Sequence, residues 1–97
     1  MARYIVLIDW TEQGVGNFQA SVDRYEAARG DFEAMGVSFH DVYWTLGTHD
    51  IVGVLDAPDG ETLAAALLKL GAAGNLRTTT LRAFNAEEMR GIIDKAG

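Results

Sequence analysis

Polar side chains stand at the ends of three apolar segments of this sequence, where they could form one end of a ligand site. Asp9 lies near the end of the first segment, Thr45 lies near the end of the second, and Asp50 precedes the third. Because side chains alternate along a strand, Asp9 shares a face with Leu7, and Asp50 shares one with Val52. If these side chains share one face of the sheet, that face is apolar at its centre and polar near one end. A cavity for a small molecule is usually built in this way.

The second and fourth segments would add aromatic and cationic groups. Tyr43 and Thr45 are predicted to lie on the same side of their strand as Phe39. Arg77 or Arg82 would place a cation beside a carboxylate, which keeps the acid ionised or holds an anionic substrate. Two tryptophans would supply aromatic walls. The candidate ligand-binding residues are therefore Asp9, Trp10, Tyr43, Trp44, Thr45, Asp50, Arg77 and Arg82.

The same polar residues also have a purely structural interpretation. In it, Asp50 caps the turn through its own backbone, and Arg82 forms an ion pair with Asp50. The sequence leaves both interpretations open.

The chain offers few residues for metal or cofactor chemistry. His40 and His49 are its only histidines, it has no cysteine, and no short-spaced cluster presents three ligands, so we predict no metal site within one chain. One histidine could still ligate haem iron; otherwise His49 belongs to a turn and His40 to a strand edge. Gly14 and Gly16 begin a dinucleotide-binding pattern, but Gln19 stands where its third glycine belongs. We therefore predict no bound cofactor.

Length and composition indicate one ordinary folded domain over residues 1–97. Hydrophobic residues make up 48% of the chain and charged residues 23%, unlike a disordered sequence. The formal net charge is −6, and only 8 residues are Lys or Arg, which argues against nucleic-acid binding. The first apolar segment is too short for a signal peptide or a membrane span. We therefore expect a cytoplasmic protein.

Hydrophobic periodicity predicts the order of the elements. Both faces of the first segment are apolar, which is typical of a central strand. After Thr11, a suitable cap, apolar residues recur at helical spacing until Gly36 ends the stretch. Asn85 and Glu88 have the spacing of a capping box. The predicted elements are strand 4–10, a helical stretch 12–35, strands 37–46 and 51–57 joined by a short turn, helix 61–70, strand 76–84, and a helix from 86 to about 95.

This order is the βαββαβ pattern of the α+β ferredoxin-like fold, with an added C-terminal helix. It predicts one antiparallel sheet with the helices on one side. The opposite side is also apolar, since Ile5 and Leu7 point away from Val6 and Ile8. A second copy of the sheet would cover it and form a dimeric α/β barrel. The alternative is a helix laid across the back of a single sheet.

Three stretches of the sequence resemble the bacterial GYD domain family. They are the stretch Y-I-V-L-I-D-W-T at 4–11 with Gly14 after it, the stretch 43–52, and the closing stretch 74–84. His49 stands where the family has the tyrosine of its Gly-Tyr-Asp motif. The resemblance implies a ferredoxin-like fold, dimeric barrel packing and no settled activity.

Three functions follow as hypotheses. The leading one is a homodimer, or a higher homo-oligomer, that binds a small organic ligand in a cavity of the sheet. The second is a cofactor-independent monooxygenase or isomerase of the kind that dimeric barrels host, with Asp50 or His49 as the general base. The third is a structural or regulatory interaction module. The sequence does not identify the ligand or a reaction.

Overall fold

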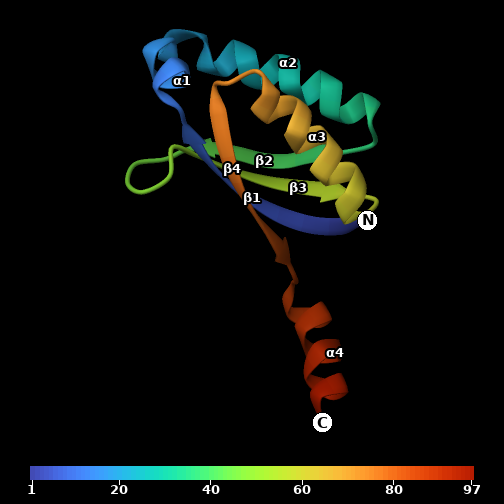
Figure 1. The fold of residues 1–97 in the computed structure, drawn as a ribbon. Coiled ribbons are helices and arrows are strands. Elements are labelled where there is room, and N and C mark those ends of the chain that lie inside the picture. The colour runs from blue at the N-terminus through green and yellow to red at the C-terminus, as the bar shows by residue number, and fades with distance from the viewer.

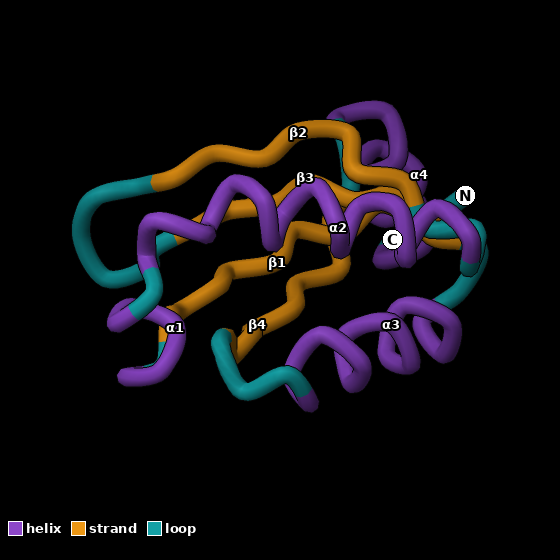
Figure 2. The backbone as a smooth tube through the Cα atoms, turned by 90° about the horizontal axis from the view of Figure 1, so that it is seen from above, coloured by secondary structure: helices purple, strands orange, loops and turns teal.

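The computed structural model describes residues 1–97 and has the predicted ferredoxin-like α+β fold. Its strands form one antiparallel sheet in the order β2-β3-β1-β4. Helices α2 and α3 cover one face of this sheet, and α4 extends away from the body beyond the other face (Figures 1 and 2). The elements are β1 (Ala2–Trp10), α1 (Glu12–Gly16), the 3-10 helix η1 (Phe18–Ala20), α2 (Ser21–Ala34), β2 (Ser38–Trp44), β3 (Ile51–Ala57), α3 (Gly60–Ala72), β4 (Leu76–Ala83) and α4 (Ala86–Ala96).

The hydrophobic core lies between the sheet and helices α2 and α3. Val6 of β1 and Leu55 of β3 are buried beneath Leu63 of α3 and Phe32 of α2. Alternation on β3 is regular, with every second residue from Ile51 to Ala57 buried. The predicted strand periodicity is therefore confirmed where it contributes most to the core.

The prediction of one continuous helical stretch between Thr11 and Met35 is wrong. The stretch divides into α1, η1 and α2 around Asn17. Glycines at 14 and 16 and Asn17 are poor helix formers, which explains the break. Phe18 and Val22 are among the apolar residues that recur at helical spacing, yet they are 58% and 52% exposed. The predicted cap is confirmed, since the Thr11 hydroxyl accepts a hydrogen bond from the Gly14 N–H at 3.1 Å.

A β-bulge in β2 corrects the predicted placement of Phe39. Phe39 pairs with Leu55, but Asp41 pairs with Val54, so His40 is the extra residue. One inserted residue reverses the alternation on either side of it. Phe39 therefore faces the helices, where it packs on Phe32, and it does not share the face of Tyr43.

The face of the sheet opposite α2 and α3 is apolar at its centre, with polar residues such as Asp41 and Thr79 around it. Ile5, Leu7, Val52 and Val54 lie there and are only half-buried. Tyr43 is 59% exposed and Leu81 is 46% exposed, because no helix of the chain packs on them. We call this surface, formed by Ile5, Leu7, Tyr43, Val52, Val54 and Leu81, the open sheet face.

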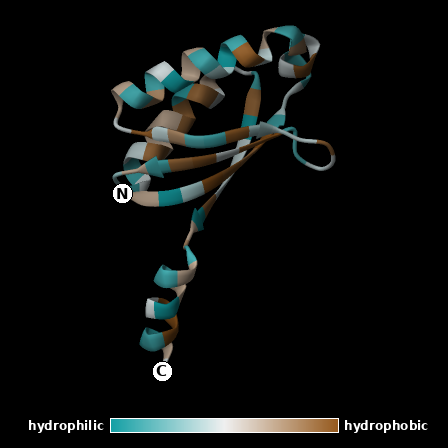
Figure 3. Cartoon of the chain, turned by 180° about the vertical axis from the view of Figure 1, so that it is seen from behind, coloured by the Kyte–Doolittle hydropathy of each residue, from teal (hydrophilic) through white to brown (hydrophobic).

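Helix α4 carries apolar side chains that the chain itself does not bury. The predicted capping box is confirmed: Asn85 Oδ1 accepts from the Glu88 N–H at 2.8 Å, and Glu88 Oε1 accepts from the Asn85 N–H at 3.0 Å. Met89 and Ile93 are 45% and 57% exposed. Figure 3 shows hydrophobic positions on this projecting helix as well as along the strands.

One ion pair at the edge of the open sheet face gives a pH-dependent prediction. Arg3 and Asp56 are register partners, and the guanidinium donates two hydrogen bonds of 3.0 Å to the carboxylate. These bonds lower the pKa of Asp56 in the folded chain, against a smaller opposing effect of burial. Because the folded pKa lies below the unfolded value of about 4, the contribution to stability is present above that value and is lost as the pH falls through the folded pKa.

We therefore expect Asp56→Asn to lower stability modestly at pH 7 and to lower it less at pH 3. Urea unfolding at the two pH values measures this difference, with Glu26→Gln in α2, beyond the first turn and without an ion pair, as the control. An equal loss of stability at both pH values would contradict the assignment.

Candidate functional site

The predicted polar residues meet at one end of the sheet, where the β2–β3 turn folds onto the end of β1. Asp9 Oδ1 lies 3.1 Å from His49 Nδ1. Asp50 Oδ2 accepts from the Trp10 backbone N–H at 2.9 Å, and the Asp50 N–H donates to the Ile8 carbonyl at 3.0 Å. Asp50 thus fastens the turn to β1. This role is structural, but it differs from the predicted one, in which Asp50 caps its own turn.

Thr45 completes this fastening. Its N–H donates to the Asp50 carbonyl at 2.8 Å, and its hydroxyl donates to the His49 carbonyl at 2.6 Å. Its hydrogen-bonding groups are therefore engaged within the turn.

The pairing of β4 with β1 shows which of the two arginines shares a face with Asp9. Arg77 is the register partner of Asp9, so it shares the face of Asp9. No ion pair joins the two side chains, and Arg77 donates to the Leu76 carbonyl at 3.3 Å. Arg82 is the register partner of Tyr4 and lies on the opposite face.

Arg82 has its own partners far from the turn. Its guanidinium lies 5.6 Å from the ring centre of Tyr4 and 4.5 Å from that of Phe84, within range of a cation–π contact. It also donates to the carbonyl oxygens of Arg3 and Ala83. The predicted pairing of Arg82 with Asp50 is therefore wrong.

The aromatic candidates divide between the two faces. Trp44 faces the helices, where its Nε1 donates to Ser21 Oγ at 2.9 Å and its ring packs edge-on against Tyr25. Trp10 also faces the helices, and its buried indole N–H has no hydrogen-bond partner. Tyr43 lies on the open sheet face. The eight predicted residues therefore do not line one cavity.

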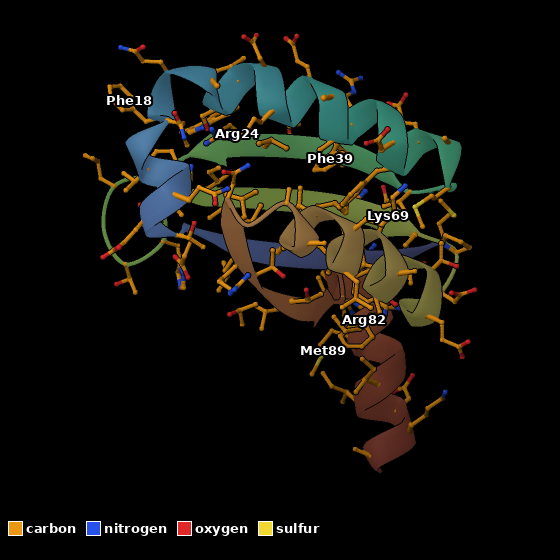
Figure 4. All side chains as sticks on the ribbon, turned by 45° about the horizontal axis from the view of Figure 1, so that its top comes forward. Phe18, Arg24, Phe39, Lys69, Arg82 and Met89 are labelled. Atoms are coloured by element: carbon orange, nitrogen blue, oxygen red, sulfur yellow. The ribbon has the colours of Figure 1, made fainter.

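A groove of about 270 Å³ lies between α2, α3 and the sheet. We call it the helix–sheet groove. Its lining is mainly apolar: 13 of its 18 residues are hydrophobic. In Figure 4, Arg24 on α2 and Lys69 on α3 lie on either side of Phe39, which rises from β2 beneath them. None of the eight predicted residues lines this groove, and neither does His49.

Small side chains leave this space open. Ala27 and Ala28 on α2 lie across the groove from Ala66 and Ala73 on or beside α3. Larger residues at these positions would fill the gap between the helices. The sequence analysis missed the groove, because alanine is common in any helix and its pattern alone does not show that two helices lie apart.

Two other findings bear on the class of site. No three His, Cys, Asp or Glu side chains lie close enough together to hold a metal ion. No helix is both long enough and apolar enough to cross a membrane.

Comparisons with known proteins agree with the fold. A protein of Thermus thermophilus described as "Glutamine synthetase and cystathionine beta-lyase binding protein" is 31% identical over 90 residues, which cover 92% of this chain and 95% of that protein. The crystal structure of TTHA0845 from the same organism superposes with a TM-score of 0.56 at 26% identity, covering 89% of this chain and 96% of that one.

The crystal structure of MtbAldR superposes with a TM-score of 0.68 at 16% identity, a likeness of fold alone. The match covers 87% of this chain and 52% of MtbAldR. The model of the GYD domain matches residues 4–93, nearly the whole sequence, in agreement with the resemblance seen in its motifs. The chain therefore belongs to the GYD domain family.

Proposed function

We propose that this protein is a homodimer that binds a small organic molecule in the helix–sheet groove. The observation that carries the proposal is the groove itself, a largely apolar space of about 270 Å³ with a few polar groups in its lining. Ligand pockets are concave, mostly apolar and equipped with a small number of polar groups, with volumes of about 300–1,000 Å³, so this groove matches the smallest of them. A groove of this size suits a ligand of one or two rings.

The homodimer is supported by the open sheet face. Contiguous apolar patches are uncommon on monomers, and twofold dimers are the commonest homo-oligomers. An isolated helix of 11 residues such as α4 is also marginal in water, so a partner that supports it is expected. A second copy placed on the open sheet face lies on the side toward which α4 projects (Figure 1). The two sheets would then enclose a dimeric α/β barrel.

A thermal-shift screen of small organic acids, alcohols and amines tests ligand binding. A compound present at 100 times its dissociation constant should add about 2.7 kcal/mol to the free energy of unfolding. Ala28→Phe fills the groove and should abolish the shift, whereas Ala64→Phe on the exposed surface of α3 should retain it. If no compound class gives a shift, or if the shift survives in Ala28→Phe, the groove is not the binding site.

A second candidate function is binding to another protein. It is favoured by the 31% identical relative, whose description names two enzymes as its binding partners. Size-exclusion chromatography of the chain mixed with purified glutamine synthetase or cystathionine beta-lyase of its own organism tests this function. A complex that forms equally well with Ala28→Phe would support protein binding, whereas the absence of a complex with either enzyme at micromolar concentration would contradict it.

A further inference from the structure

Arg24 presents a fixed positive charge to the helix–sheet groove. It lies in the first turn of α2 and is only partly exposed. Its Nη1 donates to the Asn17 carbonyl at 2.8 Å and its Nη2 to the Gly14 carbonyl at 3.1 Å. These neutral acceptors hold the guanidinium in place without cancelling its charge. Three of its five N–H groups remain free to donate.

Lys69 adds a second cation from the opposite wall. It lies on α3, lines the groove and forms no ion pair. The chain as a whole is acidic, with 14 Asp and Glu against 8 Lys and Arg. The groove differs from the rest of the chain, because its lining contains two cations that form no ion pair. The charge of the groove therefore complements an anion, not a cation.

Asp31 is the one carboxylate in the lining, and its position restricts where an anion can bind. It lies seven residues after Arg24, on the same face of α2 and about 10 Å further along the helix axis. It forms no ion pair with Arg24 or Lys69. An acidic group is therefore favoured at the Arg24 end of the groove and disfavoured at the Asp31 end.

We infer that the ligand of the helix–sheet groove is an organic anion with an apolar body, whose acidic group binds Arg24, while Lys69 on the opposite wall adds to the positive charge of the lining. The inference rests on the proposed function and specifies its ligand class. Hydrogen bonds between a guanidinium and an acid are charge-assisted and stronger than neutral ones. The apolar body would contact Phe39 and the alanines of α2.

Two fluorescent probes with the same rings test the charge of the ligand. Anilinonaphthalene sulfonate carries a negative charge, and N-phenylnaphthylamine lacks it. Groove binding is defined as the part of each titration that Ala28→Phe abolishes. We expect the wild-type chain to bind the sulfonate at least about tenfold more tightly than the uncharged probe, as expected for a hydrogen bond to a charged group.

Charge variants then locate the cations that hold the anion. Arg24→Gln and Lys69→Gln should each weaken the sulfonate, about tenfold for Arg24, and leave the uncharged probe within about twofold. Arg77→Gln, which removes a cation outside the groove, should change neither affinity. Arg24→Lys should keep part of the preference. Arg24 also ties α2 to the preceding turn, so Arg24→Gln could fail to fold. In that case Lys69→Gln and Arg24→Lys test whether the cations of the groove hold the anion.

The outcomes separate this inference from the proposed function. If both probes bind in the groove but the Gln variants do not reduce the preference for the sulfonate, the anion assignment is wrong and the groove remains a binding site. If Ala28→Phe affects neither probe, the groove is not a binding site and both proposals fall.

Discussion

Replacing Leu7 by Asp should separate the proposed homodimer into folded monomers. Leu7 lies on the open sheet face, between its register partners Val52 on β3 and Thr79 on β4. In the proposed dimer this position is dry, and a carboxylate there would lose its water without gaining a partner. The effective penalty for burying an unpaired charge is several kcal/mol. Each step of about 1.4 kcal/mol is a factor of ten in affinity, so we expect the dissociation constant to rise by about a hundredfold or more.

Analytical ultracentrifugation across a range of micromolar concentrations measures this change. The matched control is Ala64→Asp, which adds the same charge to the exposed surface of α3 and should leave the dimer intact. A wild-type chain that sediments as a folded monomer, or a Leu7→Asp variant that remains a dimer, would contradict the assignment of the open sheet face.

Replacing Gly14 by Ala should cause a large loss of stability. A Cβ atom on Gly14 would lie 2.0 Å from the Asn75 carbonyl oxygen, so the backbone of α1 or of the turn before β4 would have to move. The Thr11 N–H donates to the same oxygen at 3.0 Å, and the Thr11 hydroxyl donates to the Gly74 carbonyl at 2.6 Å. The displacement therefore strains this contact and weakens two hydrogen bonds. We expect a loss of about 3 kcal/mol.

For a chain of this length, such a loss lowers the melting temperature by more than about 10 °C. The matched control is Gly16→Ala, two residues further along the same helix, where a Cβ would meet nothing within 4 Å. We expect the control to change stability by less than about 1 kcal/mol. Equal melting temperatures for the two variants, measured by circular dichroism, would show that α1 does not approach the β4 turn this closely.

The local features of this fold were predictable from the sequence because they depend on neighbouring residues. The Thr11 cap and the Asn85–Glu88 capping box require only residues three positions apart. The alternation in β3 is also a local property. So is the glycine at position 36, which follows the C-cap of α2 and adopts a φ of 85°. Once these elements were placed in order, few topologies other than the ferredoxin-like fold remained.

The candidate site was less predictable, since it depends on how distant segments align. The bulge at His40 reversed the face of Phe39, and no single-strand pattern revealed it. The choice between Arg77 and Arg82 depended on the pairing of β4 with β1. A shift of one residue in that pairing exchanges the two faces.

The sequence by itself determined the order of the elements, their caps, the apolar character of both sheet faces and membership of the GYD family, because periodicity, capping and motifs are local properties of the chain. Only the tertiary structure decided which side chains meet. It placed Asp50 as the fastening of the β2–β3 turn, and it opened a groove between Arg24 and Lys69. The physical reason is that strand register and the separation of two helices are set by packing across the whole core, which no short stretch of sequence specifies.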